Sequence, residues 1–504
     1  MKTNLLALLA FGCVAFVGAP LWAETLNVGS RRELFVDYYL IDQLDGAKLA
    51  IGQPKDEGIA FQFDKPWEGQ YSGYASVLKV ADDDYRLYYR GAPRLITEHA
   101  FEQRTCVAVS EDGIHWKRPN LGLYEVHGTK DNNVILSEDD KLFTHNFAPF
   151  LDKSGTPQSE RFKAAAGERF TGLVIFSSED GIHWKKMFGG KAVLQNNFLD
   201  SLNIVFWSEA EQRYVCYART WLPNWGGNRW IARATSDDLE HWTSFEDVQI
   251  VHDGKQIVRA GEDVPKEHFY TNGTRPYFRA PHIYISTPGQ FTEGRALTND
   301  QISTLKFEDN DLEPPSARAR NWSGARSGGG LMSSRGGNTF QRTFMEDFIR
   351  PPIGPENWIC RCNYPCAGVV QTGPAEMSIY ATIHFGQPSR AVRRYSLRLD
   401  GFASLRAPFA GGQMVTKPFT FDGNKLSINY ATSSRGKIKM QFETPDGDPI
   451  EGFALDNCQE IVGNEIERYV VFNDSNDLGK LAGEPVRLHI MMKDADLYSF
   501  QFQK

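Results

Sequence analysis

The heptapeptide SEDGIHW spans residues 110–116 and recurs, letter for letter, at residues 178–184. A looser copy, SDDLEHW, occupies residues 236–242, and two weaker ones follow, SRGGNTF at 334–340 and RLDGFAS at 398–404. Self-similarity at intervals of tens of residues is the signature of a repeat architecture. The chain is therefore predicted to contain five copies of one structural unit.

Each copy is typical of a tight hairpin turn. Asp-Gly or Gly-Gly supplies the positive φ that such turns need, and the Ser and Asp side chains can bind turn amides. Short apolar runs precede each copy, for example YASVLKV, YRLYYRG and TCVAVS before the first. This spacing predicts three strands before each turn and one after it, which is the four-stranded blade of a β-propeller.

The predicted fold is all-β, a five-bladed β-propeller over residues 24–408 followed by a β-sandwich over residues 409–504. The N-terminal segment 24–60 is expected to lie on the propeller surface or to close its ring. Residues 287–330, within the fourth repeat, are rich in Gly, Ser, Asn and Arg and are predicted to be an inserted loop. Residues 409–504 alternate strand-like runs with Asp-Gly and Arg-Gly turns but hold no further heptapeptide, as a sandwich would.

The first residues predict export. MKTNLLALLAFGCVAFVGAPLWAE combines a lysine, an apolar run and Ala23 before Glu24, a pattern typical of a Sec-type signal peptide over residues 1–23. The residues before Cys13 fit a lipoprotein attachment site poorly, so a soluble secreted or periplasmic protein is expected. No later segment is long and apolar enough to predict a membrane span.

Cysteines crowd into one short stretch, WICRCNYPC, which holds Cys360, Cys362 and Cys366. In an exported protein this crowding predicts one disulfide and a spare thiol. Zinc is the alternative, although the spacing matches no recognised ligand pattern and no histidine lies close by.

The net charge of −8 argues against a nucleic-acid partner, because no dense basic stripe is present to neutralise phosphates. Arginines nevertheless gather in the third to fifth repeats. They either form salt bridges at strand edges or bind an anionic group of a substrate. The arginines in question are Arg219, Arg229, Arg233, Arg275, Arg279, Arg393, Arg394, Arg398 and Arg406.

At the level of motifs, the chain resembles a known group of enzymes. The succession LFVDYYLID, FDKPWEG, DSLNIVFW, FYTNGTRPYF and EMSIYA is similar to exported bacterial proteins classed with glycoside hydrolase family 32. The turn SDDLEHW resembles the blade hairpins of glycoside hydrolase families 32, 43 and 68. SEDGIHW is also similar to the sialidase Asp-box, but it has one residue fewer between Asp and Gly. The resemblance to the family 32 group covers essentially the whole mature chain.

This resemblance implies an active site in a funnel at the propeller axis, built where the innermost strands begin. It implies a carboxylate on the first blade as nucleophile or base, a middle aspartate that orients the substrate, and a later glutamate as general acid. Glycoside hydrolysis needs one protonated and one ionised carboxyl group. The catalytic candidates are Asp64 and Glu68 in FDKPWEG, Asp200 in DSLNIVFW, and Glu376 or Asp263 as the acid.

The match to the family motifs is incomplete. Neither the W-x-N-D-P phrase of the first blade nor the Arg-Asp-Pro phrase of the middle blade is present. Structural roles therefore stay open for these residues: Asp64 could cap the turn before Pro66, and Asp200 could be a turn residue before its strand. Glu376 precedes a strongly apolar run, where a buried charge is costly without a partner.

Other residues are predicted to bind the sugar. His145 and Asn146 in THNFAPF stand at the expected mouth of the second blade, and an exposed Trp221 could stack on a sugar ring or pack in the core. No cofactor and no metal are predicted, with calcium near His145 as an alternative that the resemblance suggests. The remaining binding candidates are Arg219, Arg275 and Arg361.

The sequence thus predicts an exported glycoside hydrolase that cleaves plant or algal polysaccharides or oligosaccharides with paired carboxyl groups. The alternative is a noncatalytic carbohydrate-binding propeller that has lost the family motifs. Carbohydrate is the expected partner in either case.

Overall fold

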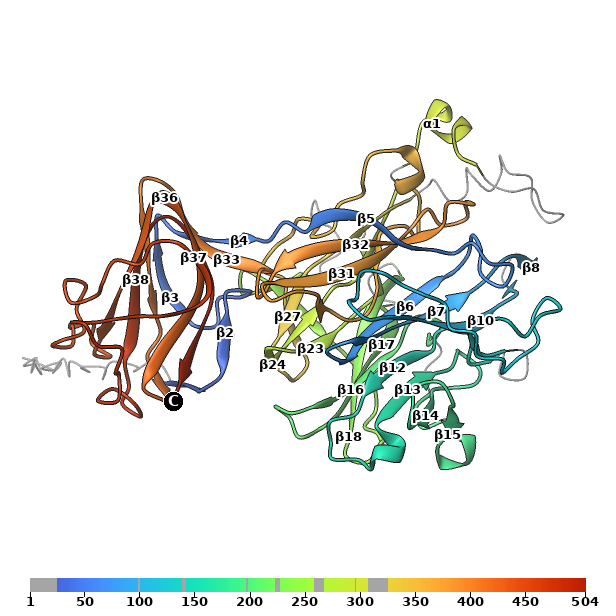
Figure 1. The fold of residues 1–504 in the computed structure, drawn as a ribbon, viewed down its shortest axis with the longest axis horizontal. Coiled ribbons are helices and arrows are strands. Elements are labelled where there is room, and N and C mark those ends of the chain that lie inside the picture. The colour runs from blue at the N-terminus through green and yellow to red at the C-terminus, as the bar shows by residue number, and fades with distance from the viewer. Residues whose placement is uncertain are drawn as a thin grey trace, which may run out of the picture.

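The computed structural model describes residues 25–97, 100–137, 142–195, 198–222, 227–257, 267–294, 296–306 and 325–504. The predicted signal peptide, residues 1–23, lies outside the described residues. The fold is all-β, as predicted, and Figure 1 shows a propeller joined to a separate sheet domain that carries the C-terminus. Within the described residues, no helix is long and apolar enough to cross a membrane.

The first three repeats each form an antiparallel four-stranded sheet, with three strands before the heptapeptide turn and one after it. The first sheet contains β6 (Gly73–Ala81), β7 (Asp84–Gly91), β10 (Arg104–Ser110) and β11 (Val134–Leu136). The second contains β12 (Ala148–Leu151), β13 (Phe162–Ala166), β14 (Val174–Ser178) and β15 (Lys185–Lys186). The third contains β16 (Ile204–Ser208), β17 (Arg213–Leu222), β18 (Asn228–Ser236) and β19 (Glu246–Asp247).

The fourth repeat is divided between two sheets. The larger contains β20 (Gln249–His252), β21 (Lys255–Gln256), β23 (Arg275–Tyr277), β24 (Ala280–Ser286), β27 (Met332–Ser334) and β28 (Thr339–Gln341). The smaller contains β22 (Glu267–Thr271), β25 (Gly289–Glu293) and β26 (Ala325–Gly329). The prediction that residues 287–330 form a loop is therefore wrong in part, because β25 pairs with β22 and β26 and a short helix, α1 (Asn299–Ser303), follows β25.

The sheet of the fifth repeat includes a strand from the start of the chain. Its sheet contains β29 (Tyr364–Pro365), β30 (Val370–Gln371), β31 (Glu376–Ile383), β32 (Ala391–Arg398) and β5 (Lys55–Gln62). Strand β5 pairs antiparallel with β32, so residues 55–62 join the last sheet of the ring. The fifth turn, RLDGFAS, was predicted to be a hairpin, and this is wrong. The next strand, β33 (Ala403–Ala407), leaves the propeller and pairs with strands of the other domain.

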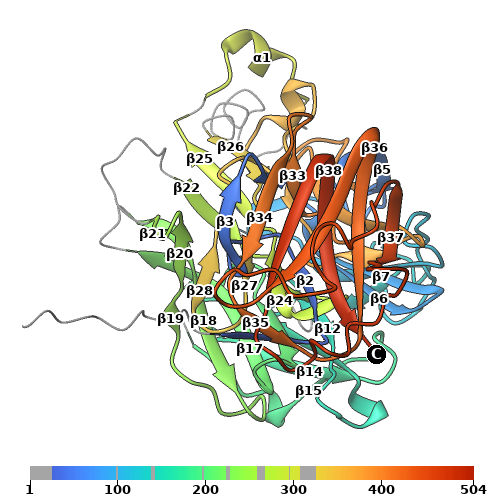
Figure 2. The same cartoon turned by 90° about the vertical axis from the view of Figure 1, so that its left-hand side faces the viewer.

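The C-terminal domain is a curled sheet of eight strands, which Figure 2 shows nearly face on. Its members are β2 (Arg32–Leu34), β3 (Ile41–Asp45), β4 (Lys48–Ile51), β33, β34 (Gly412–Thr416), β36 (Lys425–Glu443), β37 (Asn464–Tyr469) and β38 (Arg487–Gln503). A parallel pair, β1 (Leu26–Gly29) and β35 (Phe419–Phe421), accompanies it. Most of the segment 24–60 thus lies in this domain and not on the propeller surface, because β2, β3 and β4 hydrogen-bond to β38, β34 and β33.

Smaller elements complete the description. A two-stranded hairpin of β8 (Leu95–Thr97) and β9 (Ala100–Phe101) lies between β7 and β10. Single 3-10 turns occur at Gln158–Glu160, Phe188–Gly190 and Pro355–Asn357.

The heptapeptide forms the predicted turn, and its side chains hydrogen-bond to backbone amides of the turn itself. The Ser110 hydroxyl accepts hydrogen bonds from the amides of Asp112 (3.2 Å) and Gly113 (2.9 Å). The Asp112 carboxylate accepts from the amides of Ile114 and His115, both at 2.8 Å. The same Asp bonds recur in the second and third copies. Gly113 has a φ of +74°, the left-handed conformation that glycine adopts without strain.

Two of the turns also tie their sheets to a neighbouring sheet. The carbonyl of Gly181, in the second turn, accepts a hydrogen bond of 3.0 Å from Tyr88 on β7 of the first sheet. The carbonyl of Gly113, in the first turn, accepts one from Tyr380 on β31 of the fifth sheet. The repeated phrase therefore has a structural role, since it holds neighbouring sheets of the ring together.

One buried carboxylate joins the two domains. Asp400, which is fully buried, accepts hydrogen bonds from the Tyr277 hydroxyl (2.8 Å) and the Ser499 hydroxyl (2.6 Å) and lies 3.5 Å from Arg32. Tyr277 belongs to the propeller, whereas Ser499 and Arg32 belong to the C-terminal sheet. A continuous apolar cluster surrounds this contact, so the domains pack as one body.

Candidate functional site

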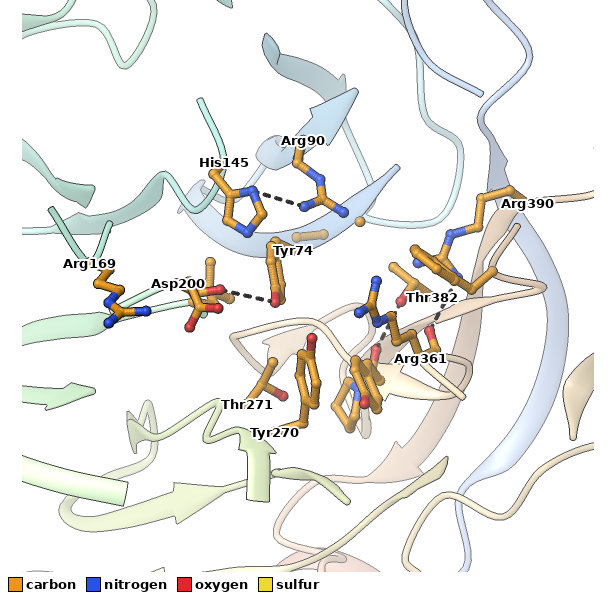
Figure 3. A pocket seen from close by; sticks show the side chains of 16 residues that line it. Tyr74, Arg90, His145, Arg169, Asp200, Tyr270, Thr271, Arg361, Thr382 and Arg390 are labelled. Carbon is orange, nitrogen blue, oxygen red and sulfur yellow. Dashed lines mark hydrogen bonds between the residues drawn. The ribbon is translucent and has the colours of Figure 1, made fainter. Parts of the chain in front are cut away.

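The strands that begin nearest the propeller axis surround a cavity of about 450 Å³, which we call the funnel. It lies where β6 begins, where the chain enters β12, β16 and β29, and where β22 ends. Figure 3 shows side chains from all of these positions pointing into one space. The residues that line it are Gly73, Tyr74, Ala75, Arg90, His145, Arg169, Asp200, Leu202, Tyr270, Thr271, Arg361, Tyr364, Pro365, Thr382, Phe385 and Arg390.

Asp200 lines the funnel at the start of the third sheet, where the sequence placed it. Its side chain is 53% exposed and forms an ion pair with Arg219 from β17. The Tyr74 hydroxyl lies 3.4 Å from the Asp200 carbonyl, to which it donates a hydrogen bond. Among the described lining residues, Asp200 is the only carboxylate.

The two acidic candidates of the first repeat lie elsewhere. Glu68 is completely buried and accepts two hydrogen bonds of 2.8 Å from the Arg118 guanidinium. Asp64 lies 3.0 Å from the same guanidinium. Neither lines the funnel, because both side chains neutralise Arg118 before the chain reaches β6. Their interactions are structural.

The candidates for a general acid are also absent from the described lining. Glu376 stands at the start of β31, the second strand of its sheet, where it pairs with Arg394 and accepts a 2.8 Å hydrogen bond from Thr372. Asp263 lies outside the described residues. Sequence reasoning missed Glu168, which lies 3.6 Å from His145 and whose pKa is raised by burial. No motif marks this loop residue.

His145 lines the funnel, as the sequence suggested. Arg90 donates a hydrogen bond of 3.2 Å to its Nδ1, and the side-chain oxygen of Gln103 lies 3.0 Å from the same nitrogen. Burial and the positive charges of Arg90, Arg219 and Arg361 hold the pKa of His145 well below its usual value, so the ring is neutral.

Asn146 was predicted to bind substrate, but its side chain is fully buried and hydrogen-bonds to the backbone. Its Nδ2 donates to the carbonyls of Gly167 (2.7 Å), Leu199 (2.7 Å) and Ser201 (2.9 Å). Leu199 and Ser201 flank Asp200, so Asn146 positions the loop that carries the aspartate.

The four other predicted binding residues divide in the same way. Arg219 is absent from the described lining and pairs with Asp200. Arg361 lines the funnel. Arg275 is instead directed between sheets, where it donates to the carbonyls of Pro149 (2.8 Å) and Val205 (3.3 Å). Trp221 packs against Phe198, with ring centroids 6.1 Å apart, and is absent from the lining.

The funnel is rich in arginine. Arg90, Arg361, Arg390 and Arg169 all line it, and Arg169 is exposed to solvent. Burial lowers the pKa of Arg90 and of Arg390 to about 10, which leaves both cationic at neutral pH. Backbone carbonyls anchor them, since Arg90 donates to Tyr71 at 2.8 Å and Arg390 to Ser72 at 2.7 Å. No sequence motif marks Arg90, Arg169 or Arg390, because their positions converge only through the fold.

Tyrosines complete the site. Tyr270 lies one residue before the end of β22, and its ring faces the guanidinium groups of Arg229, Arg219 and Arg361 at 5.0, 5.5 and 5.9 Å from the ring centroid. Burial alone would raise the pKa of Tyr270, but these three charges outweigh it and lower the pKa to about 8. Tyr270 belongs to the phrase FYTNGTRPYF, which was noted only as a family likeness.

The cysteine prediction is wrong. The six cysteines of the described residues are all free and buried. Cys362 packs in a cluster with Tyr71 and Phe385, whereas Cys366 packs in another with Trp67 and Val392. The thiols therefore face different parts of the core. Across the described residues, no group of three or more His, Cys, Asp or Glu side chains is placed to hold a metal ion.

No protein-family model matches this chain, and no curated protein matches its sequence. Among solved structures, the chain is similar to one titled a glycoside hydrolase, with 11% identity over 69% of this chain and 92% of the other and a TM-score of 0.45. It is also similar to an N-acetylgalactosamine deacetylase from F. plautii in complex with blood group B trisaccharide, at 10% identity, 71% and 97% coverage and a TM-score of 0.42. An exo-inulinase from Aspergillus awamori is similar at 10% identity, 88% and 100% coverage and a TM-score of 0.34.

Proposed function

We propose that this protein is an exported glycoside hydrolase whose funnel binds a carbohydrate with a carboxylate or sulfate group, such as an acidic plant or algal polysaccharide. The observation that carries the proposal is the lining of the funnel, in which Arg90, Arg361 and Arg390 surround the same cavity as Asp200. A guanidinium group binds carboxylate and sulfate through paired hydrogen bonds, which gives both charge and geometry for recognition.

Arg361 is the arginine best suited to meet the anion. Within the described residues no carboxylate forms an ion pair with it, and its guanidinium lies over Tyr270 and Phe385, 5.9 and 5.1 Å from the ring centroids. Its backbone has a φ of +60°, a left-handed conformation that costs a non-glycine residue about 1–3 kcal/mol. Strain of this kind clusters at functional sites, which supports a binding role for Arg361.

Asp200 is the ionised group that hydrolysis requires. The ion pair with Arg219 favours the charged carboxylate, while the half-exposed side chain can reach a sugar in the funnel. A positioned carboxylate of this kind accepts a proton from the attacking water or stabilises positive charge at the anomeric carbon. The N-terminal sequence pattern supports export.

A noncatalytic carbohydrate-binding propeller is the second candidate. One observation favours it: the described lining holds a single carboxylate, whereas most glycoside hydrolases use two. Such a protein would use the same arginines to hold the same class of sugar without cleaving it.

The deciding experiment compares acidic, sulfated and neutral oligosaccharides of matched backbone, with reducing ends measured for cleavage and calorimetry for binding. Wild type is compared with Asp200→Asn, with Arg361→Met and with Arg435→Met, an exposed arginine of the C-terminal sheet that serves as the control. Cleavage of anionic sugars that is lost in Asp200→Asn supports the hydrolase. Binding without any cleavage supports the second candidate, and equal binding of neutral sugars contradicts the anionic specificity.

A further inference from the structure

Tyr270 is tied to the loop of Asp200. The Ser201 hydroxyl, one residue after Asp200, donates a hydrogen bond of 2.7 Å to the Tyr270 carbonyl. Figure 3 shows the Tyr270 hydroxyl directed into the funnel, toward the hydroxyl of Tyr74, with which it interacts. The Tyr74 hydroxyl in turn lies 3.4 Å from the Asp200 carbonyl. Asp200 and Tyr270 both line the funnel, so the carboxylate and the phenol border the same space.

The surroundings of Tyr270 are cationic on several sides. Arg219 on β17, Arg229 on β18 and Arg361 before β29 face its ring. The other titratable neighbours are Tyr74 on β6 and Tyr364 on β29, whose ring centroid lies 5.1 Å away. Each cation stabilises a negative oxygen on Tyr270 far more than a neutral one, because the groups lie in a largely buried, low-dielectric site.

The tyrosines of this cluster are not equivalent. Burial raises the pKa of Tyr74 and of Tyr364, whereas that of Tyr270 is lowered to about 8 because the arginines outweigh its burial. At neutral pH Tyr270 is therefore mostly protonated, yet it releases its proton more easily than an ordinary tyrosine, whose pKa is about 10. A proton donor is most effective when its pKa lies near the working pH.

We propose that Tyr270 is the general acid of the funnel and takes the place of the second carboxyl group; this inference rests on the proposed hydrolase function. As the bond between the anomeric carbon and the glycosidic oxygen breaks, its electron pair goes to that oxygen, which receives the proton of the Tyr270 hydroxyl. Water forms the new bond to the anomeric carbon and gives its proton to Asp200. Solvent then returns one proton to the phenolate and removes one from Asp200, so the net reaction consumes one water.

The neighbouring groups are poorer donors. His145 is held neutral by burial and by Arg90, so it has no proton to give as an imidazolium. Glu168 has a raised pKa but contacts His145 from outside the described lining. Glu168 is therefore the rival that the experiment has to separate from Tyr270.

The first measurement needs no sugar. Tyrosinate absorbance is titrated in the whole protein for wild type, Tyr270→Phe and Tyr364→Phe, the last being a matched removal of a neighbouring hydroxyl. We expect wild type and Tyr364→Phe to ionise one tyrosine near pH 8, and Tyr270→Phe to lack that step. A wild type without a tyrosine that ionises near pH 8 would overturn the proposal.

The second measurement uses the glycan that the wild type cleaves and a nitrophenyl glycoside of the same sugar, whose leaving group departs as the nitrophenolate anion and needs no proton. Tyr270→Phe should lose at least about a hundredfold in turnover of the glycan, the low end for a positioned acid, and far less with the nitrophenyl glycoside. If the wild type is active and Tyr270→Phe turns over the glycan equally fast, the acid role is overturned and the hydrolase function stands. The same conclusion follows if Glu168→Gln loses turnover of the glycan but not of the nitrophenyl glycoside, while Tyr270→Phe loses neither. A wild type that cleaves no glycan overturns the hydrolase and, with it, the acid role.

Discussion

The hydroxyl of Ser201 donates a hydrogen bond of 2.7 Å to the carbonyl of Tyr270, and this bond joins the third repeat to the fourth at the funnel. Ser201 follows Asp200, so the same contact sets where the carboxylate lies relative to the phenol. Asn146, from the second repeat, holds the carbonyls on both sides of Asp200. Three repeats thus cooperate to place one short loop.

Asp200→Asn should keep the fold and lower hydrolysis at least about a hundredfold, because the amide cannot accept the proton of water. The side chain is half exposed, so its replacement by an isosteric amide costs little stability. Turnover is measured on the cleaved glycan, with melting temperatures compared. Asp64→Asn, an acidic candidate outside the funnel, is the control, and equal turnover in the two variants would remove Asp200 from the mechanism.

Activity should fall as pH rises through about 8, since Tyr270 donates a proton only while it is protonated. Among the neighbouring charges, that of Arg361 lowers the pKa of Tyr270 the most. Arg361→Met should therefore raise this pKa and shift the alkaline limb of kcat to higher pH. The pH profiles of wild type and variant test this directly. An alkaline limb that stays in place in Arg361→Met would contradict the electrostatic account.

Asn146→Ala should destabilise the protein, because three backbone carbonyls lose a buried donor. Each buried polar group left without a partner costs about 1–3 kcal/mol, so the change should be clear in denaturant unfolding. Activity should fall as well, through displacement of Asp200. Asn120→Ala, at an exposed asparagine outside the funnel, gives the control, and a wild-type stability for Asn146→Ala would exclude the positioning role.

Asp400→Ala should strongly destabilise the contact between the domains. Breaking a buried ion pair by removing one partner costs about 3–5 kcal/mol, because the buried Arg32 then keeps only the exposed Glu467 as a counter-charge. We expect the single unfolding transition of wild type, followed by calorimetry, to move to lower temperature or to split in two. Asp446→Ala, which alters an exposed carboxylate of the same domain outside this contact, should leave the transition near its wild-type position.

The six described cysteines should react slowly with thiol reagents in the native protein and fully once it is unfolded. Burial raises the pKa of Cys106, Cys360 and Cys366, which keeps these thiols protonated and unreactive. A colorimetric thiol count without reductant checks this. If the unfolded protein shows two free thiols fewer than the six expected, two cysteines form a disulfide, as the spacing of WICRCNYPC had suggested.

The sequence by itself determined the features that depend on neighbouring residues. The bonds of Ser110 and Asp112 to their own turn amides form within a few residues, so the heptapeptide predicted the hairpins and their repetition. The position of Asp200, directly before an apolar strand, could be predicted for the same reason. Local turn chemistry and alternating apolar residues carry this information wherever the chain folds.

Only the tertiary structure decided the contacts between distant segments. Glu68 and Asp200 both precede innermost strands, yet Glu68 is drawn to Arg118 and Asp200 faces the funnel. Strand β33 follows a turn like the others but pairs with β4 and β38, because the N-terminal strand β5 already occupies the edge beside β32. The arginines around Tyr270 lie far apart in sequence, and closure of the ring brings their charges together on one phenol.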